Sequence, residues 1–299
     1  MWQLFASFAL VATALQNVGD KWALVNDRRI DTSVATFWRN SLAFVFTVSV
    51  GLWGILGPLT WYFDPFIIGF ALMLICSSYF YTYMLRHVEV TGIEMDNYIA
   101  PIAFLAVDLL LVEAALSIEQ IIGVMLLTCG GFMLAIDGRS HHLKREFSPK
   151  VLSIILFWVA YGGVQFYLFK HLHETAGLNG VSFMASTLII VIAVLLFVVV
   201  LRGKFTALFS VTSARYLPPV VLSKACDTAA TLLTLTALTY ASASQVAAIG
   251  ALAPLILLAI AVFVQKETRF NIRERVDRAN LVSKALAVGL LALGIFLVS

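Results

Sequence analysis

Apolar residues fill this sequence in long blocks that are separated by short polar segments. Blocks of about 18 or more apolar residues have the length that an α-helix needs to cross a bilayer. The pattern therefore predicts ten membrane-spanning helices, and Pro218-Pro219 is expected to open the eighth. The expected ranges are 2–24, 33–56, 66–86, 95–113, 117–136, 151–170, 181–201, 216–239, 244–265 and 282–298.

Composition supports the same fold class. Hydrophobic residues make up 61% of the 299 positions and charged residues only 12%, whereas a soluble domain carries about 25% charged residues. We therefore predict an all-α, multi-pass membrane protein of the cell's inner or plasma membrane, surrounded by lipid. Met1-Trp2-Gln3 has no basic residue, so the first block is expected to be a retained helix and not a cleaved signal peptide.

Several function classes are excluded by what the motifs lack. The basic residues lie in loops and not on one helix face, so no nucleic-acid partner is expected. The three cysteines lie inside apolar blocks, which favours packing over a disulfide framework. No cofactor or metal site is expected, because the sequence has no Walker loop and His171-x-His173-Glu174 has no further ligands nearby.

The two halves of the chain resemble each other. Matched features follow in the same order, which predicts a five-helix repeat at 1–140 and a second at 141–299. An odd number of helices in each half makes the second repeat inverted relative to the first, as in many secondary transporters. The matched features are Gln16 and Gln165, Lys21 and Lys170, Pro101 and Pro254, Gly123 and Ala287, and Gly130 and Gly294.

Charge placement predicts an orientation. The loops after odd-numbered spans, with their flanks, hold 17 of the 20 lysines and arginines, and the loops after even-numbered spans hold only Lys170. Since positive loops face the cytoplasm, the basic loops are expected inside and both termini outside.

Three charged residues fall at membrane depth: Asp108, Lys224 and Asp227. A charge at that depth costs about 2.5–3.5 kcal/mol on insertion scales and needs a partner, water or a function. Lys224 and Asp227 are three residues apart on one helix face, which Thr231 and Thr234 continue. This face is either a neutralised pair that joins helices or a site for substrate or a coupling proton.

Uncharged polar residues in the apolar blocks are further candidates. Asn97, Pro101 and Asp108 share one face of the fourth span. Asp108 is either a proton acceptor or a side chain bonded to a neighbouring helix, and Pro101 and Pro254 are hinges or packing kinks. Gln16, Asn17 and Gln165 either line a cavity or merely join helices. Tyr79, Tyr81 and Tyr83 alternate along the third span, so at most one or two of them can line a cavity.

The glutamates at the ends of two spans have a structural interpretation. Glu113 and Glu267 are expected to fix the turn into the following span. Small residues then recur at seven-residue spacing on the next span, which indicates close helix contact within a monomer or at a homodimer face. The small residues are Gly123 and Gly130, and Ala287 and Gly294.

Together these features resemble the ten-helix EamA-type branch of the drug/metabolite transporter superfamily. In that family the fourth and ninth spans carry a proline and end in Gly-Glu; here Val112-Glu113 and Lys266-Glu267 take that place. Gln120, Gly123 and Gly130 stand where the family has a glutamine and two spaced glycines, and Lys21 and Arg39 where it often has basic residues. The resemblance implies transport of a small metabolite by a monomer or homodimer, often by exchange or proton coupling.

We therefore expect a secondary-active transporter, and not an enzyme, that binds a small polar metabolite such as a zwitterion or organic anion. Lys224 would contact an anionic group, and Asp227 and Asp108 a cationic group or a proton. The alternative is a membrane-embedded enzyme that acts on a lipid or lipid-linked group, with Glu94, Asp96 and Asn97 near the membrane surface. A non-transporting scaffold would gain little from the buried charges.

Overall fold

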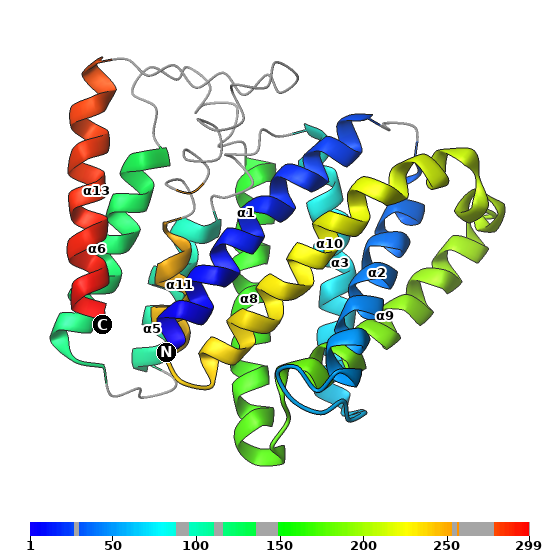
Figure 1. Ribbon diagram of the computed structural model, residues 1–299, viewed down its shortest axis with the longest axis horizontal. Coiled ribbons are helices and arrows are strands. Elements are labelled where there is room, and N and C mark those ends of the chain that lie inside the picture. Colours follow the sequence, from blue (N-terminus) through cyan, green and yellow to red (C-terminus); the bar gives the residue numbers. More distant parts are fainter. Residues whose placement is uncertain are drawn as a thin grey trace.

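The computed structural model describes residues 1–26, 30–87, 96–110, 116–135, 149–252, 256 and 278–298. These residues form ten α-helices and one short 3-10 helix, η1 (Phe205–Phe209), with no strand among them (Figure 1). The α-helices are α1 (Trp2–Asn26), α2 (Thr32–Leu52), α3 (Pro65–His87), α5 (Asp96–Leu110), α6 (Ile118–Ala135), α8 (Pro149–Ala176), α9 (Gly180–Leu201), α10 (Val211–Leu238), α11 (Ala243–Gly250) and α13 (Arg278–Val298).

Short polar residues set the helix ends. Asn179 caps α9 by accepting a hydrogen bond from the backbone N–H of Ser182 at 2.9 Å. The same helix stops at Gly203, which adopts a left-handed φ of 63° that glycine tolerates without strain. The N–H of Lys204 then donates to the carbonyl of Val199 at 3.0 Å, so the last turn closes in a Schellman motif.

The helices pack in pairs that bring distant parts of the chain together. α1 lies along α10, α6 along α13, α2 along α9, and α5 against α11 (Figure 1). Small residues permit the close approach: a Cβ added to Gly19 of α1 would lie 3.1 Å from Cβ of Ser223 on α10. Between α6 and α13, a Cβ at Gly123 would lie 2.5 Å from Cγ2 of Val298.

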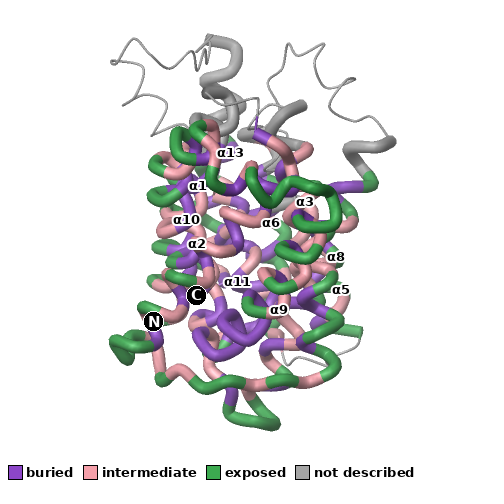
Figure 2. Tube along the Cα trace, turned by 90° about the vertical axis from the view of Figure 1, so that its right-hand side faces the viewer, coloured by how far each residue is buried: buried purple, intermediate pink, exposed green. Residues whose placement is uncertain are grey.

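Aromatic stacking fills the interior at one end of the bundle. Phe70 of α3 stacks on Tyr161 of α8, with ring centroids 5.2 Å apart, and on Phe183 of α9 at 5.4 Å. Phe70 and Phe183 are almost completely buried. Buried residues lie mainly on the inner sides of the helices, whereas exposed residues mark the outer sides and the loops (Figure 2).

The outer surface has the apolar character that lipid requires. Large apolar side chains stand exposed on several helices, among them Phe197 at 62%, Leu222 at 70% and Phe296 at 76%. Such extensive apolar exposure is unfavourable in water. Among the described residues, four helical segments are long and apolar enough to cross a membrane: 65–83, 153–176, 180–201 and 211–238. The all-helical, membrane-type fold class is therefore confirmed.

Most of the described helix ends lie within a few residues of the predicted span ends, but α11 ends at Gly250, well before the expected end of the ninth span at 265. The count of ten membrane spans stays a prediction. The prediction that Pro218-Pro219 opens the eighth span is wrong, because α10 begins at Val211 and contains both prolines. The earlier start is stabilised by Ser210, whose Oγ accepts from the N–H of Ser213, and by Ser213, whose Oγ donates to the carbonyl of Ala207 at 2.7 Å.

Candidate functional site

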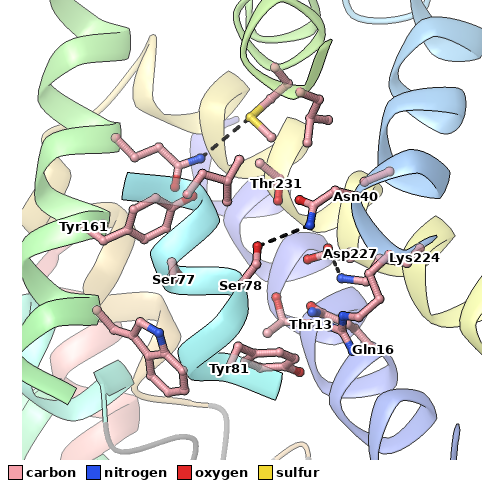
Figure 3. Close-up of a pocket in the computed structure, with 18 of the residues that line it drawn as sticks. Thr13, Gln16, Asn40, Ser77, Ser78, Tyr81, Tyr161, Lys224, Asp227 and Thr231 are labelled. Carbon is pink, nitrogen blue, oxygen red and sulfur yellow. Dashed lines mark hydrogen bonds and ion pairs between the residues drawn. The ribbon is translucent and has the colours of Figure 1, made fainter. Parts of the chain in front are cut away.

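A cavity of about 330 Å³, lined by both polar and apolar side chains, lies between the helices of the bundle (Figure 3). Six helices surround it: α1, α2, α3, α8, α9 and α10. Several residues that line it, such as Gln16 of α1 and Lys224 of α10, lie near the middle of their helices. The volume is within the range of small-molecule sites, about 300–1,000 Å³. Its polar lining comprises Thr13, Gln16, Asn17, Arg39, Asn40, Ser77, Ser78, Tyr81, Trp158, Tyr161, Gln165, Lys224, Asp227 and Thr231.

One ion pair belongs to the wall of this pocket. Lys224 Nζ lies 2.5 Å from Asp227 Oδ2, as the three-residue spacing on one helix face predicts. The two side chains differ in exposure: that of Lys224 is 7% exposed and that of Asp227 is 28% exposed. Asp227 is therefore the acidic group that a molecule in the pocket can reach.

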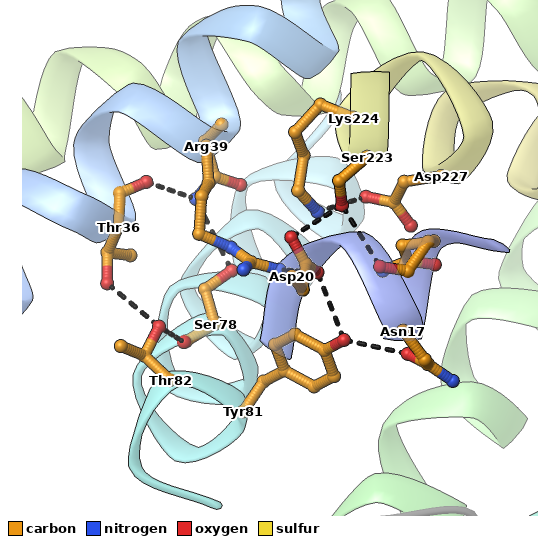
Figure 4. A network of polar contacts seen from close by, with 12 residues as sticks. Asn17, Asp20, Thr36, Arg39, Ser78, Tyr81, Thr82, Ser223, Lys224 and Asp227 are labelled. Atoms are coloured by element: carbon orange, nitrogen blue, oxygen red, sulfur yellow. Dashed lines mark hydrogen bonds and ion pairs between the residues drawn. The ribbon is translucent and has the colours of Figure 1, made fainter. Parts of the chain in front are cut away.

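A second ion pair joins α1 to α2 at the edge of the pocket (Figure 4). Arg39 Nη2 donates to Asp20 Oδ2 at 2.6 Å, and the Asp20 side chain is fully buried. Ser223 Oγ donates to the other oxygen, Oδ1, at 2.5 Å. The hydroxyl of Tyr81 lies 3.0 Å from Asp20 Oδ2 and 2.8 Å from Oδ1 of Asn17. Asp20 thus ties α1 to α2, α3 and α10.

Arg39 is held from two sides but keeps hydrogen-bonding capacity. Its guanidinium carbon lies 4.7 Å from the centre of the Tyr81 ring, which is a cation–π contact. A guanidinium carries five N–H donors, so the bond from Nη2 to Asp20 leaves others for a further acceptor. Because Arg39 lines the pocket, an anionic group there would meet two cations, Arg39 and Lys224.

The charges of this region balance. Asp20 and Asp227 carry two negative charges, and Arg39 and Lys224 carry two positive charges. Asp20 is buried behind its partners, so the charged groups that line the pocket are Arg39, Lys224 and Asp227. A pocket with two cations and one anion suits a ligand that has a carboxylate or another anionic group, with or without a cationic group.

Uncharged groups add hydrogen-bonding capacity around the charges. Asn40 Nδ2 donates to the carbonyl of Thr36 at 2.8 Å and lies 3.4 Å from the hydroxyl oxygen of Ser78. Gln165 Nε2 has a weak contact with the sulfur of Met184 at 3.8 Å. Since a thioether is a poor acceptor, the Gln165 amide would gain from a stronger one in the pocket.

The structure brings most of the sequence-predicted pocket residues together. Both residues of the α10 ion pair and three uncharged residues line the same cavity, although they come from α1, α8 and α10 (Figure 3). They are Gln16, Gln165, Lys224, Asp227 and Thr231.

Asp108 lies elsewhere, at the contact of α5 with α11. It is 2% exposed, and its Oδ2 accepts a hydrogen bond from the backbone N–H of Ser244 at 2.8 Å. Its Oδ1 accepts from the hydroxyl of Tyr167 at 2.9 Å. Ser244 lies in the first turn of α11, where backbone N–H groups have no partner within the helix. A carboxylate there accepts a hydrogen bond from one of them, and its negative charge interacts favourably with the positive end of the helix dipole. This geometry gives Asp108 a helix-capping role.

Tyr79 also lies away from the cavity. It packs against a small apolar cluster of Ala71, Val191 and Leu195, and its buried hydroxyl has no hydrogen-bond partner among the described residues. Pro101 is buried in α5 and cannot donate a hydrogen bond to the carbonyl four residues before it.

The remaining candidates are not placed. Asn97 belongs to α5, but its side chain is outside the described part of the chain, as are Glu94, Glu113, Pro254 and Glu267. Within the described part, no three His, Cys, Asp or Glu side chains gather so that they could hold a metal ion.

Sequence reasoning missed Asp20, which lies within the expected first span, 2–24. A signal for it does exist. Asp20 continues the helix face of Thr13, Gln16 and Asn17 at three- and four-residue steps, and Arg39 is an unbalanced cation in the next span. Two opposite charges in adjacent apolar helices favour a pair.

Comparison with known proteins gives a fold and no function. No protein-family model matches the chain, and no curated protein matches it. A solved structure named only "Crystal structure of protein" aligns over 99% of this chain and 97% of its own length. The TM-score is 0.64 at 13% sequence identity, so the likeness concerns the fold alone.

Proposed function

We propose that the protein is a secondary-active transporter that moves a small zwitterionic or anionic metabolite through the central pocket by alternating access. The observation that carries the proposal is the group of Arg39, Lys224 and Asp227 around a cavity inside an apolar bundle. Charges at membrane depth are costly, and in such proteins they commonly mark substrate or ion pathways.

The pocket suggests how the substrate is held. Arg39 offers a planar array of donors that suits a carboxylate, and Lys224 adds a compact positive charge. Asp227, the more exposed member of its pair, accepts an ammonium group or a coupling proton. Gln16, Asn40 and Gln165 supply further hydrogen bonds. When a carboxylate binds Lys224, Asp227 loses its partner and becomes free to bind the substrate's cationic group.

Helix pairing supports the inverted repeat. The repeat proposed from sequence matches α1 with α8, α2 with α9, α3 with α10, α5 with α11, and α6 with α13. If a two-fold axis relates the halves, it exchanges the two helices of each matched pair, so a contact between matched helices is compatible with the axis. Three matched pairs pack together in this way: α2 with α9, α5 with α11, and α6 with α13. The axis also relates the contact of α2 with α10 to that of α3 with α9, and both contacts occur.

An asymmetry in this pairing supports alternating access. α1 packs along α10 far more extensively than their matched helices, α8 and α3, pack along each other. In the alternate state of the proposed cycle, α8 would close on α3 while α1 separates from α10. The Asp20 network, which ties α1 to α10 through Ser223, would break in that step.

We place the protein in the drug/metabolite transporter superfamily as part of the same proposal. The motifs around Pro101, Gly123 and Gly130 support this placement, and so does a fold in which α5 and α6 are followed by α11 and α13 in matching positions. Orientation, with basic loops in the cytoplasm and both termini outside, stays a prediction of the charge count.

A thermal-shift screen of the purified protein tests the substrate class. A ligand at about 100 times its Kd stabilises the folded state by about 2.7 kcal/mol, which raises Tm by several degrees. Small zwitterions and carboxylates should raise Tm, and neutral sugars should not. The shift should disappear in Lys224→Ala and Asp227→Asn but persist in Ser49→Ala, whose side chain is exposed on α2 and lies outside the pocket.

Two outcomes would contradict the proposal. If only neutral compounds stabilised the protein, Arg39, Lys224 and Asp227 would not be the groups that bind the substrate. Stabilisation by a lipid that the protein then converts to product, without flux across the membrane, would favour the alternative of a membrane-embedded enzyme.

A further inference from the structure

The short helix η1 lies between two helices that are long and apolar enough to cross a membrane. α9 ends at Leu201, η1 covers Phe205–Phe209, and α10 begins at Val211. The two long helices are joined at one edge of the bundle (Figure 1). Because an apolar helix enters this segment and another leaves it, residues 202–210 lie at the surface of the bilayer.

The segment and its flanks carry positive charge. Arg202 and Lys204 precede η1, Arg215 follows it on α10, and all three are exposed. The sequence has no acidic residue between Glu174 and Asp227. Within the described part of the chain, no ion pair involves any of the three cations. Their charges are therefore available to a partner outside the protein.

η1 is held firmly against α2. Leu208 is buried, and its carbonyl accepts a hydrogen bond from Nε1 of Trp38 at 3.3 Å. Arg202 Nη1 donates to Oγ of Ser33 at 2.8 Å, and the nearby carboxylate of Asp31 accepts from the Ser33 backbone N–H at 2.9 Å. A guanidinium has five N–H donors, so Arg202 keeps others for an external acceptor.

The outer side of η1 is apolar. Phe205 and Phe209 are both exposed, Phe209 by 74%, and their ring centroids lie 5.8 Å apart. Exposed Leu201 ends the apolar surface of α9 beside them. At a bilayer surface, apolar side chains enter the boundary of the acyl chains while neighbouring cations stay among the headgroups.

Arg215 is placed at the same level by the length of α10. The helix has 28 residues and is about 42 Å long, whereas the hydrocarbon core of a bilayer is about 30 Å thick. Leu222, seven residues after Arg215 and therefore on the same helix face, is also exposed. Arg215 thus stands at the end of a lipid-facing stripe, where a long basic side chain reaches the headgroups.

We infer that η1 and its cations form a docking surface for the headgroups of anionic phospholipids. This surface, the η1 patch, consists of Arg202, Lys204, Phe205, Phe209 and Arg215. Charge complementarity selects the partner, because a zwitterionic headgroup carries its own cation beside the phosphate. A lysine or arginine near an anionic membrane surface contributes about a fivefold preference. The inference does not depend on the proposed transport function.

The test measures which lipid lies next to η1. In a background without the three native cysteines, Thr206→Cys places a fluorescent label on an exposed position of η1. The full-length protein is reconstituted into phosphatidylcholine vesicles that all contain the same small fraction of phosphatidylglycerol. The bromine quencher is carried either by the phosphatidylglycerol or by an equal amount of phosphatidylcholine, so the surface charge is the same in both.

Brominated phosphatidylglycerol should quench the label as strongly as a roughly fivefold or larger local excess requires. A label at Ser49→Cys, exposed near the opposite end of α2, should be quenched equally by the two lipids. The triple variant Arg202→Gln, Lys204→Gln and Arg215→Gln should abolish the excess at η1. The matched control is Lys170→Gln, which removes a cation from α8 outside the η1 patch and should keep the excess.

Three results would overturn the inference. The first is equal quenching of the η1 label by the two lipids, or an excess that survives the triple variant. The second is an equal excess at both labels, since the whole protein would then attract the lipid. The third is loss of the excess in inorganic phosphate but not in chloride of the same ionic strength, since the η1 patch would then be a site for free phosphate.

Discussion

Asp20 is the residue on which the geometry of the pocket depends most. It has no exposed surface, yet its carboxylate accepts hydrogen bonds from Arg39 at 2.6 Å and from Ser223 at 2.5 Å. The carboxylate both neutralises a buried guanidinium and links α1 to three other helices, α2, α3 and α10. Its contribution is therefore structural in the state described here, and it is also the contact that must change if α1 and α10 separate.

Asp20→Asn should destabilise the protein strongly. The amide cannot neutralise Arg39, and breaking a buried ion pair by removing one partner costs about 3–5 kcal/mol. Thermal unfolding in detergent would measure this as a large fall in Tm. The matched control is the double variant Asp20→Asn with Arg39→Gln, which removes both charges and should recover much of the loss. A wild-type Tm for the single variant would contradict the role assigned to the pair.

Sequence could predict some of these residues and not others, for a physical reason. Lys224 and Asp227 are neighbours on one helix face, so their pairing follows from local geometry. The partners of Asp108 are set by tertiary packing, because Ser244 lies 136 residues further along the chain. The sequence therefore identified Asp108 as a charged residue in an apolar span, but only the folded structure shows that it caps α11.

The contact between α6 and α13 is the clearest case of packing through small residues. A Cβ at Gly294 would lie 2.9 Å from the carbonyl oxygen of Gly123, and a Cβ at Gly130 would lie 3.0 Å from that of Ala287. Backbones this close leave no room for a side chain. The seven-residue spacing of small residues predicted such a contact, and the structure pairs the two stripes with each other.

Gly123→Leu should separate α6 from α13. A leucine there meets Val298 Cγ2 and backbone atoms of α13 at 3.0 Å or less, and overpacking of this kind costs about 1–3 kcal/mol. Gly289→Leu is the matched control, because a Cβ at Gly289 on α13 meets nothing within 4 Å. Tm in detergent should fall for the first variant only. An equal fall in Tm for the two variants would show that the loss of stability comes from replacing a glycine within a helix, and not from the contact between α6 and α13.

At the scale of elements, the long apolar helices followed directly from the sequence, because their length and composition are local properties. The start of α10 did not. Prolines ordinarily begin helices, but here Ser210 and Ser213 stabilise an additional stretch before Pro218. Capping hydrogen bonds of this kind depend on where the preceding 3-10 helix lies, which the hydrophobic pattern does not report.

The close approach of α1 to α10 allows a test of alternating access in the whole molecule. A Cβ added at Gly19 would lie 3.1 Å from Cβ of Ser223, so a small outward shift reaches the separation of about 3.5–4.5 Å found in disulfides. In a background without the three native cysteines, Gly19→Cys with Ser223→Cys should form a disulfide that locks α1 to α10 and blocks substrate exchange in liposomes. Reduction should restore exchange to the level of the two single variants.

Full exchange by the oxidised double variant would show that α1 and α10 need not separate, and it would exclude the rocking motion proposed here.

The arrangement of the whole molecule could be predicted from the sequence only in part. The internal matches suggested a duplicated unit, and the observed helix pairs support it. In the proposed cycle, the looser contact of α3 with α8 would belong to one conformational state, and no pattern of residues encodes which state is observed.

The most direct test of the central claim is counterflow in proteoliposomes, with a zwitterion that the thermal-shift screen identifies. Liposomes loaded with unlabelled substrate should accumulate the labelled form when they contain the wild-type protein. Lys224→Ala and Asp227→Asn should lower the rate by roughly tenfold or more, since each removes a charged contact of about 1.5–3 kcal/mol. Undiminished counterflow by both variants would contradict the assignment of the central pocket as the transport site.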